Sequence, residues 1–359
     1  MKAAVCREFG TPLIIEDVAL DSPRAGEVRV RLTACGICQS DVHSMEGAWG
    51  GVLPSVFGHE AAGIVDEVGD GVEGLQPGQH VVVTLIRACH QCFFCRIGQP
   101  ALCETSFRLD RETPLTAADG SPIGQGTRTG GFAEAVLVDA SQAVRIPDDV
   151  PLDSAALLAC AVITGFGAVV NTAGVQAGNS VVVIGTGGVG LNAIQAAAVS
   201  GAGPVIAVDI DGRKLEVARS FGATHVINPR GEDVDAVVAR LTDGRRADTV
   251  IVTAGSGSAV EQGIRLARRA GSVVLVGMPP SGNTSRIDPG QVAHDGQRIL
   301  GSKVGSAQPQ IDIPRLVRLY QDGHLKLDEL VSTRYPLGEI NEAVASSARG
   351  DAIRNVIVF

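Results

Sequence analysis

The stretch Val181–Gly190 reads VVVIGTGGVG, an apolar run followed directly by a G-x-G-x-x-G pattern. The β-branched run predicts a buried strand, and the residues after the glycines predict a helix. Gly185 permits a tight turn, Gly187 lets a pyrophosphate approach the backbone, and Gly190 lets helix and strand pack closely. The stretch therefore predicts a dinucleotide-binding turn. Its predicted cofactor-binding residues are Gly185, Gly187, Gly188, Val189 and Gly190.

Strand and helix patterns alternate along the chain after this turn. Apolar runs that predict strands lie at residues 181–184, 205–208, 225–227, 249–252, 273–276 and 299–304. Helical patterns lie between them, at residues 189–200, 213–221, 233–241 and 259–270. Six strands joined by helical crossovers predict a doubly wound parallel sheet, an α/β fold of the Rossmann type.

An acidic residue follows the second predicted strand, where dinucleotide-binding sheets contact a ribose. Asp209 lies 19 residues after Gly190. A carboxylate there accepts hydrogen bonds from both ribose hydroxyls and repels a 2′-phosphate, so it selects NAD over NADP. Lys214 can add a bond to the same ribose. The alternative is a helix-capping Asp after an ordinary glycine turn, which the register of strand, glycines, helix and acid disfavours.

The long uncharged run from Ser154 to Val208 could also indicate a membrane hairpin. Glycine, asparagine and proline residues interrupt it repeatedly, as at Gly165, Asn171 and Pro204. Parallel strands covered on both faces are almost continuously apolar. A buried strand, helix and strand therefore explain the run better, and no membrane partner is predicted.

Residues 1 to about 150 have mostly β patterns, with β-branched runs at residues 28–30, 61–68, 80–83 and 135–138. A small barrel-type unit is expected from them. The polar stretch from Glu104 to Gly131 has no clear period and is expected to be a long functional or interface loop. Near the C-terminus, Pro314–Gln321 predicts a helix. Asn355–Val358 predicts a strand that returns to the first domain.

Composition and charge exclude several classes of partner. The 359 residues allow two domains, and the net charge of −9 with 3% aromatic residues disfavours nucleic acid and anionic membranes. Eight cysteines without a secretory signal indicate a reducing, cytoplasmic location. Clustered cysteines in such a location are expected to bind metal.

Four cysteines form one such cluster, spaced three, three and eight residues apart. They are Cys89, Cys92, Cys95 and Cys103. Four thiolates complete a tetrahedron around zinc and leave no position for water, so a structural zinc is predicted. Reduced thiols or a disulfide pair are the plain alternative. A zinc ribbon that binds nucleic acid is a third, but no basic or aromatic face accompanies the cluster.

The stretch Cys35–His43 offers two chemistries. Cys35 and Cys38 form a C-x-x-C, which could be a redox pair or half of a zinc site. Cys38 followed by Ser40, Asp41 and His43 instead suggests a metal ligand beside a proton path. A catalytic zinc needs three protein ligands and one open position. His59, 21 residues after Cys38, and Cys160 are further candidates, although spacing alone does not join Cys160 to Cys38.

Taken together, these motifs resemble the zinc-dependent medium-chain alcohol dehydrogenases over essentially the whole chain. The similar features are the four-cysteine cluster, the glycine turn at 185–190, and GHEAAG at 58–63 with Gly69 and Val72. The resemblance implies a GroES-like, mostly-β catalytic domain at residues 1–160 and 304–359. A Rossmann NAD-binding domain at residues 161–303 interrupts it, and the active site lies between them.

The resemblance also implies roles for single residues. Cys38, His59 and Cys160 would hold the catalytic zinc, with Asp41 and Glu60 close behind it, orienting His59 and tuning the metal charge. An alkoxide would form on this zinc, and its proton would leave through Ser40, the nicotinamide ribose and His43. Further residues implied at the cofactor are Gly277, Met278 and Arg354. The implied substrate pocket contains Trp49, Leu85 and Met278.

Two departures from the family bear on function. Gln39 replaces a basic residue that often faces the pyrophosphate, which suggests a weaker hold on NAD and faster NADH release. Ser40, smaller than Thr, would leave room for bulky or secondary alcohols. The long 104–131 stretch resembles that of glutathione- or mycothiol-linked formaldehyde dehydrogenases and dimeric alcohol dehydrogenases. Candidate carboxylate binders in that stretch are Arg108, Arg111 and Arg128.

The expected function is therefore that of an NAD-dependent zinc alcohol dehydrogenase with two zinc ions per chain, acting on a small alcohol, aldehyde or ketone. A formaldehyde dehydrogenase acting on a thiol adduct is the alternative within the class. A non-catalytic scaffold that binds NAD and zinc is the alternative from another class, disfavoured by the proton relay. A homo-oligomer, dimer or tetramer, is expected.

Overall fold

The computed structural model describes residues 1–359, which fold into two compact units. The first comprises Met1–Ala161 and Gln308–Phe359, and the second comprises Val162–Ala307. The second unit thus extends to Ala307, whereas the sequence placed its end at residue 303.

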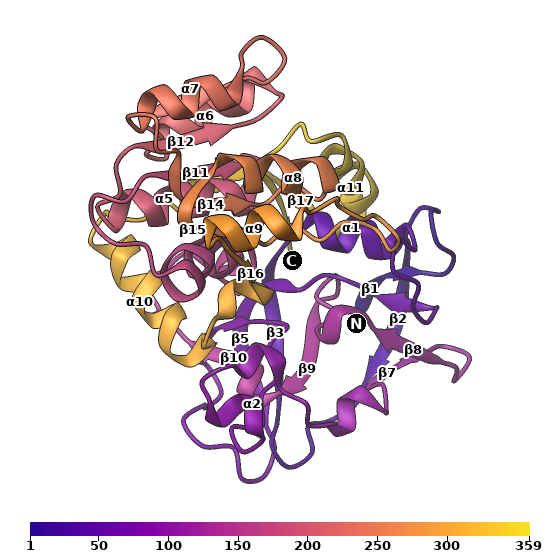
Figure 1. The fold of residues 1–359 in the computed structure, drawn as a ribbon. Helices are drawn as coiled ribbons and strands as arrows, with labels where there is room; N and C mark the ends of the chain where they lie inside the picture. Colours follow the sequence, from indigo (N-terminus) through magenta and orange to yellow (C-terminus); the bar gives the residue numbers. More distant parts are fainter. The chain divides into compact units, whose positions relative to one another are not determined.

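The second unit contains a six-stranded parallel sheet in the order β13-β12-β11-β14-β15-β16. Its strands are β11 (Val181–Ile184), β12 (Val205–Val208), β13 (His225–Ile227), β14 (Ala247–Val252), β15 (Ala267–Leu275) and β16 (Arg298–Gly301). The main helices are α5 (Gly188–Val199), α6 (Gly212–Ser220), α7 (Val234–Leu241), α8 (Gly257–Leu266) and α9 (Pro289–Asp295). This confirms the doubly wound sheet; in Figure 1, α8 and α9 lie in front of β14 and β15, which they contact.

The strand order changes direction at β11, because β12 and β14 lie on its two sides. Ligands of such sheets bind at the carboxyl ends of the strands beside this switch point. The glycine turn follows β11, and Asp209 follows β12, so both lie at that edge. The core beneath is built from buried apolar residues of the strands and of α7 and α8, including Val182, Val208 and Val250.

Two boundaries in this unit differ from the sequence prediction. Helix α8 ends at Leu266 and β15 begins at Ala267, where a helix to residue 270 was predicted. Pairing of Ala267 with Ala247 of β14 overrides the helical preference of the two arginines that follow. Strand β16 ends at Gly301, and residues 303–306 form the 3₁₀-helix η7 (Lys303–Ser306).

The first unit is mostly β and contains a closed barrel, with strand order β1-β2-β7-β8-β4. A second sheet has the order β10-β6-β5-β3-β18-β17, and β9 pairs with β3. The barrel strands are β1 (Lys2–Cys6), β2 (Ile14–Leu20), β4 (Ser55–Val56), β7 (Leu115–Ala117) and β8 (Pro122–Gln125). The sheet strands are β3 (Glu27–Gly36), β5 (Glu60–Val68), β6 (His80–Val83), β9 (Ala135–Asp139), β10 (Ala143–Arg145), β17 (Val331–Pro336) and β18 (Arg354–Val358).

Strand β18 pairs with β3 and β17, so the C-terminal strand does return to the first unit, as predicted. The helices of this unit are α1 (Gln39–Met45), α2 (Phe93–Arg96), α3 (Leu152–Ala155), α10 (Pro309–Gln321) and α11 (Ile340–Arg349). Shorter 3₁₀ turns are η1 (Pro100–Leu102), η2 (Arg108–Asp110), η3 (Gly126–Arg128), η4 (Ala140–Gln142), η5 (Ala156–Ala159), η8 (Asp328–Leu330) and η9 (Leu337–Glu339).

The stretch from Glu104 to Gly131 is not a loop, contrary to the sequence expectation. It supplies β7 and β8, and these strands close the barrel. They are three and four residues long, too short to show an alternating pattern in a polar sequence.

The uncharged run also differs from the prediction, because helices precede its first strand. They are α3, η5, α4 (Ala161–Gly167) and the π-helix η6 (Ala168–Ala173). No single helix of the chain has the length and apolar character needed to cross a membrane. Only two consecutive helices separated by a bend, Leu152–Ala159 and Ala161–Ala173, meet those requirements in combination.

Candidate functional site

Strand pairing brings two predicted metal ligands together in the first unit. The end of β3 pairs with the start of β5 through Gly36 and Glu60. Cys38 follows the end of β3 and His59 precedes β5, so both lie at the same edge of the sheet. Cys160 comes directly after η5, a segment that packs against β5. The topology thus supplies the connection between Cys38 and Cys160 that spacing alone could not.

The ligand atoms of Cys38, His59, Glu60 and Cys160 all lie within 4.8 Å of one another. These side chains are buried, with at most 9% of their surface exposed. Two thiols and an imidazole are ligands that zinc prefers, and a carboxylate oxygen is a further one. Buried donors of this kind without a cation would be unusually costly to bring together. The donor set therefore fits a zinc ion.

Asp41 holds His59 in place within this cluster. Its Oδ1 accepts hydrogen bonds from His59 Nδ1 at 2.7 Å and from the Gly58 amide at 3.1 Å. Its Oδ2 accepts from the Cys38 amide at 3.2 Å. Bonding at Nδ1 leaves the lone pair of His59 Nε2 for a metal. One carboxylate therefore orients one candidate ligand and anchors the segment that carries another.

Glu60 makes no hydrogen bond to His59, so of the two acids expected behind the metal only Asp41 holds that ring directly. Glu60 Oε2 accepts a hydrogen bond from Arg354 Nε at 3.2 Å, while its Oε1 is buried without a hydrogen-bond partner. Burial raises the pKa of Glu60 to about 8 despite the charge of Arg354. An unpartnered carboxylate oxygen among three other donors is suited to face a cation.

The charge of Arg354 also reaches the thiols, because its Nη2 lies 3.7 Å from Cys38 Sγ. A hydrogen bond from Cys160 and this guanidinium together lower the pKa of Cys38 well below its usual range, although burial opposes them. The thiolate form needed of a metal ligand is thus favoured at Cys38.

Cys35 lies outside the cluster and within the hydrophobic core. Burial, followed by the nearby Asp41 and Glu60 charges, raises the pKa of Cys35 well above its usual range. Its thiol contacts the carbonyl oxygen of Gly36 at 3.6 Å. A thiol held protonated in an apolar core has little reactivity, so the redox-pair interpretation of the C-x-x-C is not supported.

The second cysteine cluster is assembled as predicted. The four sulfurs of Cys89, Cys92, Cys95 and Cys103 lie within 4.8 Å of one another and form no disulfide. Backbone amides donate to two of the sulfurs: Cys92 N–H donates to Cys89 Sγ at 3.2 Å, and Cys89 N–H donates to Cys103 Sγ at 3.4 Å. A hydrogen bond from Thr105, together with backbone amides, lowers the pKa of Cys89 to about 6. Four partly exposed thiols in this geometry fit a structural zinc.

The glycine turn of the second unit has the features that its sequence predicted. Gly185 has a φ of +93°, and a side chain at Gly190 would meet the carbonyl oxygen of Gly185 at 1.9 Å. At Gly187, by contrast, nothing lies within 4 Å of the position a side chain would occupy. The backbone is therefore open for a phosphate at Gly187, beside the start of α5.

Asp209 is fixed in place by this turn. Its Oδ2 accepts hydrogen bonds from the Thr186 amide at 2.8 Å and the Thr186 hydroxyl at 2.9 Å, and its Oδ1 accepts from the Asp211 amide. Thr186 was not predicted from the sequence, and its hydroxyl joins the turn to Asp209, the residue that follows β12. Thr253 was missed as well, and its hydroxyl donates to the carbonyl oxygen of Gly185 at 2.8 Å.

The residues of the predicted proton path lie on α1. Ser40 Oγ is 3.4 Å from His59 Nε2, and His43 stands three residues later on the same side of the helix. No hydrogen bond joins Ser40 to His43 directly. The imidazole of His43 is partly exposed and packs edge-on against Trp49, with ring centroids 5.8 Å apart.

The other predicted pocket and cofactor residues come from both units. Leu85 is half-buried after β6, whereas Met278 belongs to the second unit and is 64% exposed. Neighbouring Gly277 lies against Thr253 and Ala254, where a side chain would not fit. Lys214 is half-buried on α6. Arg354 has its guanidinium directed at Glu60 and Cys38.

Two of the three arginines proposed as carboxylate binders already have acidic partners. Arg108 forms a two-pronged ion pair with Glu27, at 2.6 and 2.8 Å. Arg128 lies 3.1 Å from Asp110. Arg111 is exposed and donates only to the carbonyl oxygen of Phe107, at 3.4 Å. Of the three, Arg111 alone remains available to a ligand.

Comparisons with known proteins agree with this assembly. A family model described as "Zinc-binding dehydrogenase" matches residues 188–322, and one described as "Alcohol dehydrogenase GroES-like domain" matches residues 24–148.

Individual relatives span the whole chain. An NDMA-dependent alcohol dehydrogenase from Amycolatopsis methanolica is 39% identical, covering 99% of this chain and 98% of its own. An S-(hydroxymethyl)glutathione dehydrogenase from Paracoccus denitrificans is 33% identical, covering 100% and 99%. The crystal structure of benzyl alcohol dehydrogenase from Acinetobacter calcoaceticus superposes with a TM-score of 0.93 at 34% identity, covering 100% of this chain and 99% of that one.

Proposed function

This chain belongs to the zinc-dependent alcohol dehydrogenase family, and we propose that it transfers a hydride between an alcohol and NAD at a zinc held by Cys38, His59 and Cys160. The observation that carries the proposal is the convergence of these three buried donors, with Glu60, within 4.8 Å. A scaffold without catalysis would have no use for the proposed proton path of Ser40 and His43 beside these donors.

Zinc at such a site acts as a Lewis acid and makes an alcohol proton easier to remove near neutral pH. The chain's own residues prepare that chemistry. Asp41 fixes the tautomer and orientation of His59, and Arg354 favours the thiolate of Cys38. Glu60 adds a carboxylate to the same cluster, and its Oε1 is buried without a hydrogen-bond partner.

Ser40 is the group proposed to take the alcohol proton, because its hydroxyl lies beside His59 Nε2. A hydroxyl accepts one proton while donating its own, so it passes charge onward without becoming charged itself. His43 is the proposed exit to solvent, since its imidazole is partly exposed and its ring nitrogens can both accept and donate a proton. The missing direct bond between them agrees with a relay through the cofactor ribose.

NAD is the proposed cofactor, and Asp209 is the reason for preferring it to NADP. The carboxylate is held rigidly by Thr186 and Asp211, at the end of β12. A fixed negative charge at this position repels a 2′-phosphate while its remaining lone pairs accept ribose hydroxyls. The second proposed metal is a structural zinc on Cys89, Cys92, Cys95 and Cys103.

The second candidate substrate is the adduct that an aldehyde forms with a thiol. The name of the Paracoccus relative, S-(hydroxymethyl)glutathione dehydrogenase, favours this candidate. Arg111 is the residue proposed to bind the adduct's carboxylate, because Arg108 and Arg128 are engaged with acids.

Assembly into dimers or tetramers through the free edge of β16 is also proposed, since that strand ends the sheet order. None of the eight cysteines forms a disulfide, which supports the proposal of a reducing, cytoplasmic setting.

An activity screen tests the proposal. Zinc-loaded enzyme is assayed for NAD reduction with ethanol, a secondary alcohol and benzyl alcohol, and for formaldehyde oxidation with and without glutathione or mycothiol. A parallel arm adds NDMA, the compound named for the Amycolatopsis relative. Turnover of simple alcohols without thiol supports the main proposal, and formaldehyde oxidation only with thiol supports the second. No turnover in any arm would contradict both.

A further inference from the structure

A polar cavity of about 930 Å³ lies in the second unit, away from the glycine turn. Its walls come from the segments that precede β11, β12 and β14, from the first residues of β14 and β15, and from α9, so it lies at the amino ends of the parallel strands. The glycine turn lies at their carboxyl ends. The cavity falls within the size range of small-molecule sites, and nothing in the proposed hydride transfer uses it.

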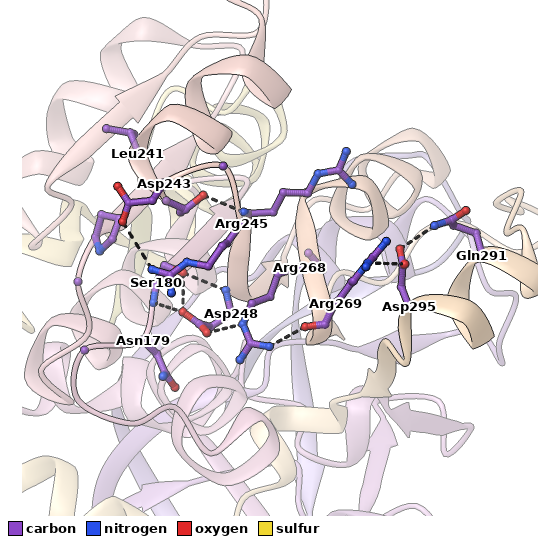
Figure 2. A pocket seen from close by; sticks show the side chains of 17 residues that line it. Asn179, Ser180, Leu241, Asp243, Arg245, Asp248, Arg268, Arg269, Gln291 and Asp295 are labelled. Atoms are coloured by element: carbon purple, nitrogen blue, oxygen red, sulfur yellow. Dashed lines mark hydrogen bonds and ion pairs between the residues drawn. The ribbon is translucent and has the colours of Figure 1, made fainter.

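Arginine is concentrated in this cavity, although the chain as a whole carries a net charge of −9. The four arginines that line it are Arg245, Arg246, Arg268 and Arg269. Figure 2 shows Arg245, Arg268 and Arg269 along the lining, with dashed lines linking Arg268 to Asp248 and Arg269 to Asp295.

The acids around the cavity neutralise only part of this charge. Asp248 is fully engaged: one oxygen accepts from the Ser180 amide and hydroxyl, and the other from Arg268 at 2.6 Å. Asp243 lies 3.5 Å from Arg245, but both side chains are largely in solvent, where such a pair contributes little. Arg246 forms no ion pair at all.

The backbone at and beside these arginines has positive φ angles at three residues other than glycine. Asp243 and Arg246 have φ values of +51° and +74°, and Ala270, which follows Arg269, has a φ of +57°. Residues with side chains rarely adopt this left-handed conformation, which costs free energy and is concentrated at functional sites. The Arg246 amide donates to the Thr242 hydroxyl at 2.9 Å, which fixes the turn. This hydrogen bond therefore holds Arg246 in its left-handed conformation.

We propose that this cavity binds a multiply charged organic phosphate through Arg245, Arg246 and Arg269. Guanidinium groups bind phosphate oxygens in pairs, and three of them partly free of acids can contact two phosphate groups. Nucleic acid is a poorer ligand, because the net negative charge of the chain repels it.

The cavity is connected to the cofactor turn by two short strands. β11 joins Ser180 at the cavity to Gly185, which follows the strand, and β14 contains Asp248 at the cavity and is followed by Thr253. The two strands meet again at the turn, where the Thr253 hydroxyl donates to Gly185. The cavity and the cofactor turn therefore lie at opposite ends of the same two strands.

Calorimetric titration of the zinc-loaded enzyme with fructose 1,6-bisphosphate tests the proposal. Saturating NAD⁺ is present throughout, so that the probe does not bind at the glycine turn instead. Separate titrations use inorganic phosphate and citrate, at low ionic strength, where screening is weak. We expect one bisphosphate per chain with a Kd below about 1 mM, and binding of phosphate and citrate at least roughly tenfold weaker.

Charge-removing variants locate the site. Arg246→Gln and Arg269→Gln should each weaken bisphosphate binding about tenfold, the effect of one charged hydrogen bond. Arg265→Gln is the matched control, because Arg265 is also exposed in this unit, on α8, but does not line the cavity. Absence of binding with NAD⁺ present, equal affinity for citrate, or equal weakening by Arg265→Gln would each overturn the proposal.

Discussion

Replacing Asp41 by Asn tests how the candidate zinc site is held together. The change keeps the size of the side chain and removes its charge. Asp41 is completely buried and accepts three hydrogen bonds, from His59 Nδ1, the Gly58 amide and the Cys38 amide. An Asn can keep its oxygen toward His59 and Gly58, but its NH₂ group then faces the Cys38 amide, another donor.

The magnitude follows from that mismatch. A buried donor left without an acceptor costs about 1–3 kcal/mol, and the loss of charge weakens the His59 bond further. Because the strained groups carry two of the candidate ligands, most of this cost should appear in zinc affinity. We expect affinity and kcat/KM to fall roughly 10- to 100-fold, the usual effect of removing an outer partner of a ligand.

Zinc retention against a competing chelator and initial rates of NAD reduction are the measurements. Asp119→Asn is the matched control, because Asp119 is exposed and accepts hydrogen bonds only within its own turn, from Ser121. If Asp41→Asn held zinc as tightly as the unchanged protein, the proposed role of Asp41 would be refuted.

Three further changes test other parts of the site and fold. Asp209→Asn should increase kcat/KM with NADP, relative to kcat/KM with NAD, by about tenfold or more, because the repulsion of a 2′-phosphate is lost. If steady-state kinetics show the same relative kcat/KM values as in the unchanged protein, Asp209 does not select NAD over NADP. Cys103→Ser should release one of two zinc ions and lower Tm by about 5 °C or more. Elemental analysis measures the zinc content, and calorimetry measures Tm. Retention of both zinc ions would contradict a four-thiolate site. Burial raises the pKa of Glu27, but the hydrogen bonds from Arg108 and Arg24 outweigh it and hold that pKa below its usual range. The Glu27 charge therefore stabilises the fold at pH values above the usual pKa of Glu. Glu27→Gln should lower Tm near pH 7, and this effect should shrink as the pH falls through about 4. An equal decrease in Tm at pH 7 and below about pH 4 would refute this linkage.

Local patterns allowed much of the second unit to be predicted from sequence. The glycine turn and the strand that ends at Asp209 depend on neighbouring residues, so their periodicity is visible in the chain. The end of α8 was misplaced because Arg268 and Arg269 favour a helix, whereas pairing of Ala267 with β14 decides the outcome.

The parts that sequence could not provide depend on contacts between distant residues. Spacing does not reveal that Cys160 meets Cys38, which follows from the packing of η5 against β5. The divided role of Glu60, with one oxygen on Arg354 and one unpartnered, depends on the return of β18 to β3. The barrel strands within residues 104–131 were missed because very short strands carry no period.

The zinc content of two cysteine variants tests the central claim most directly. Cys38 is proposed as a ligand of the catalytic zinc, whereas Cys35, three residues earlier, lies in the core outside the donor cluster. We predict two zinc ions per chain in the unchanged protein and in Cys35→Ala, and one in Cys38→Ala, with loss of alcohol oxidation only in the latter. Two zinc ions and normal activity in Cys38→Ala would contradict the account.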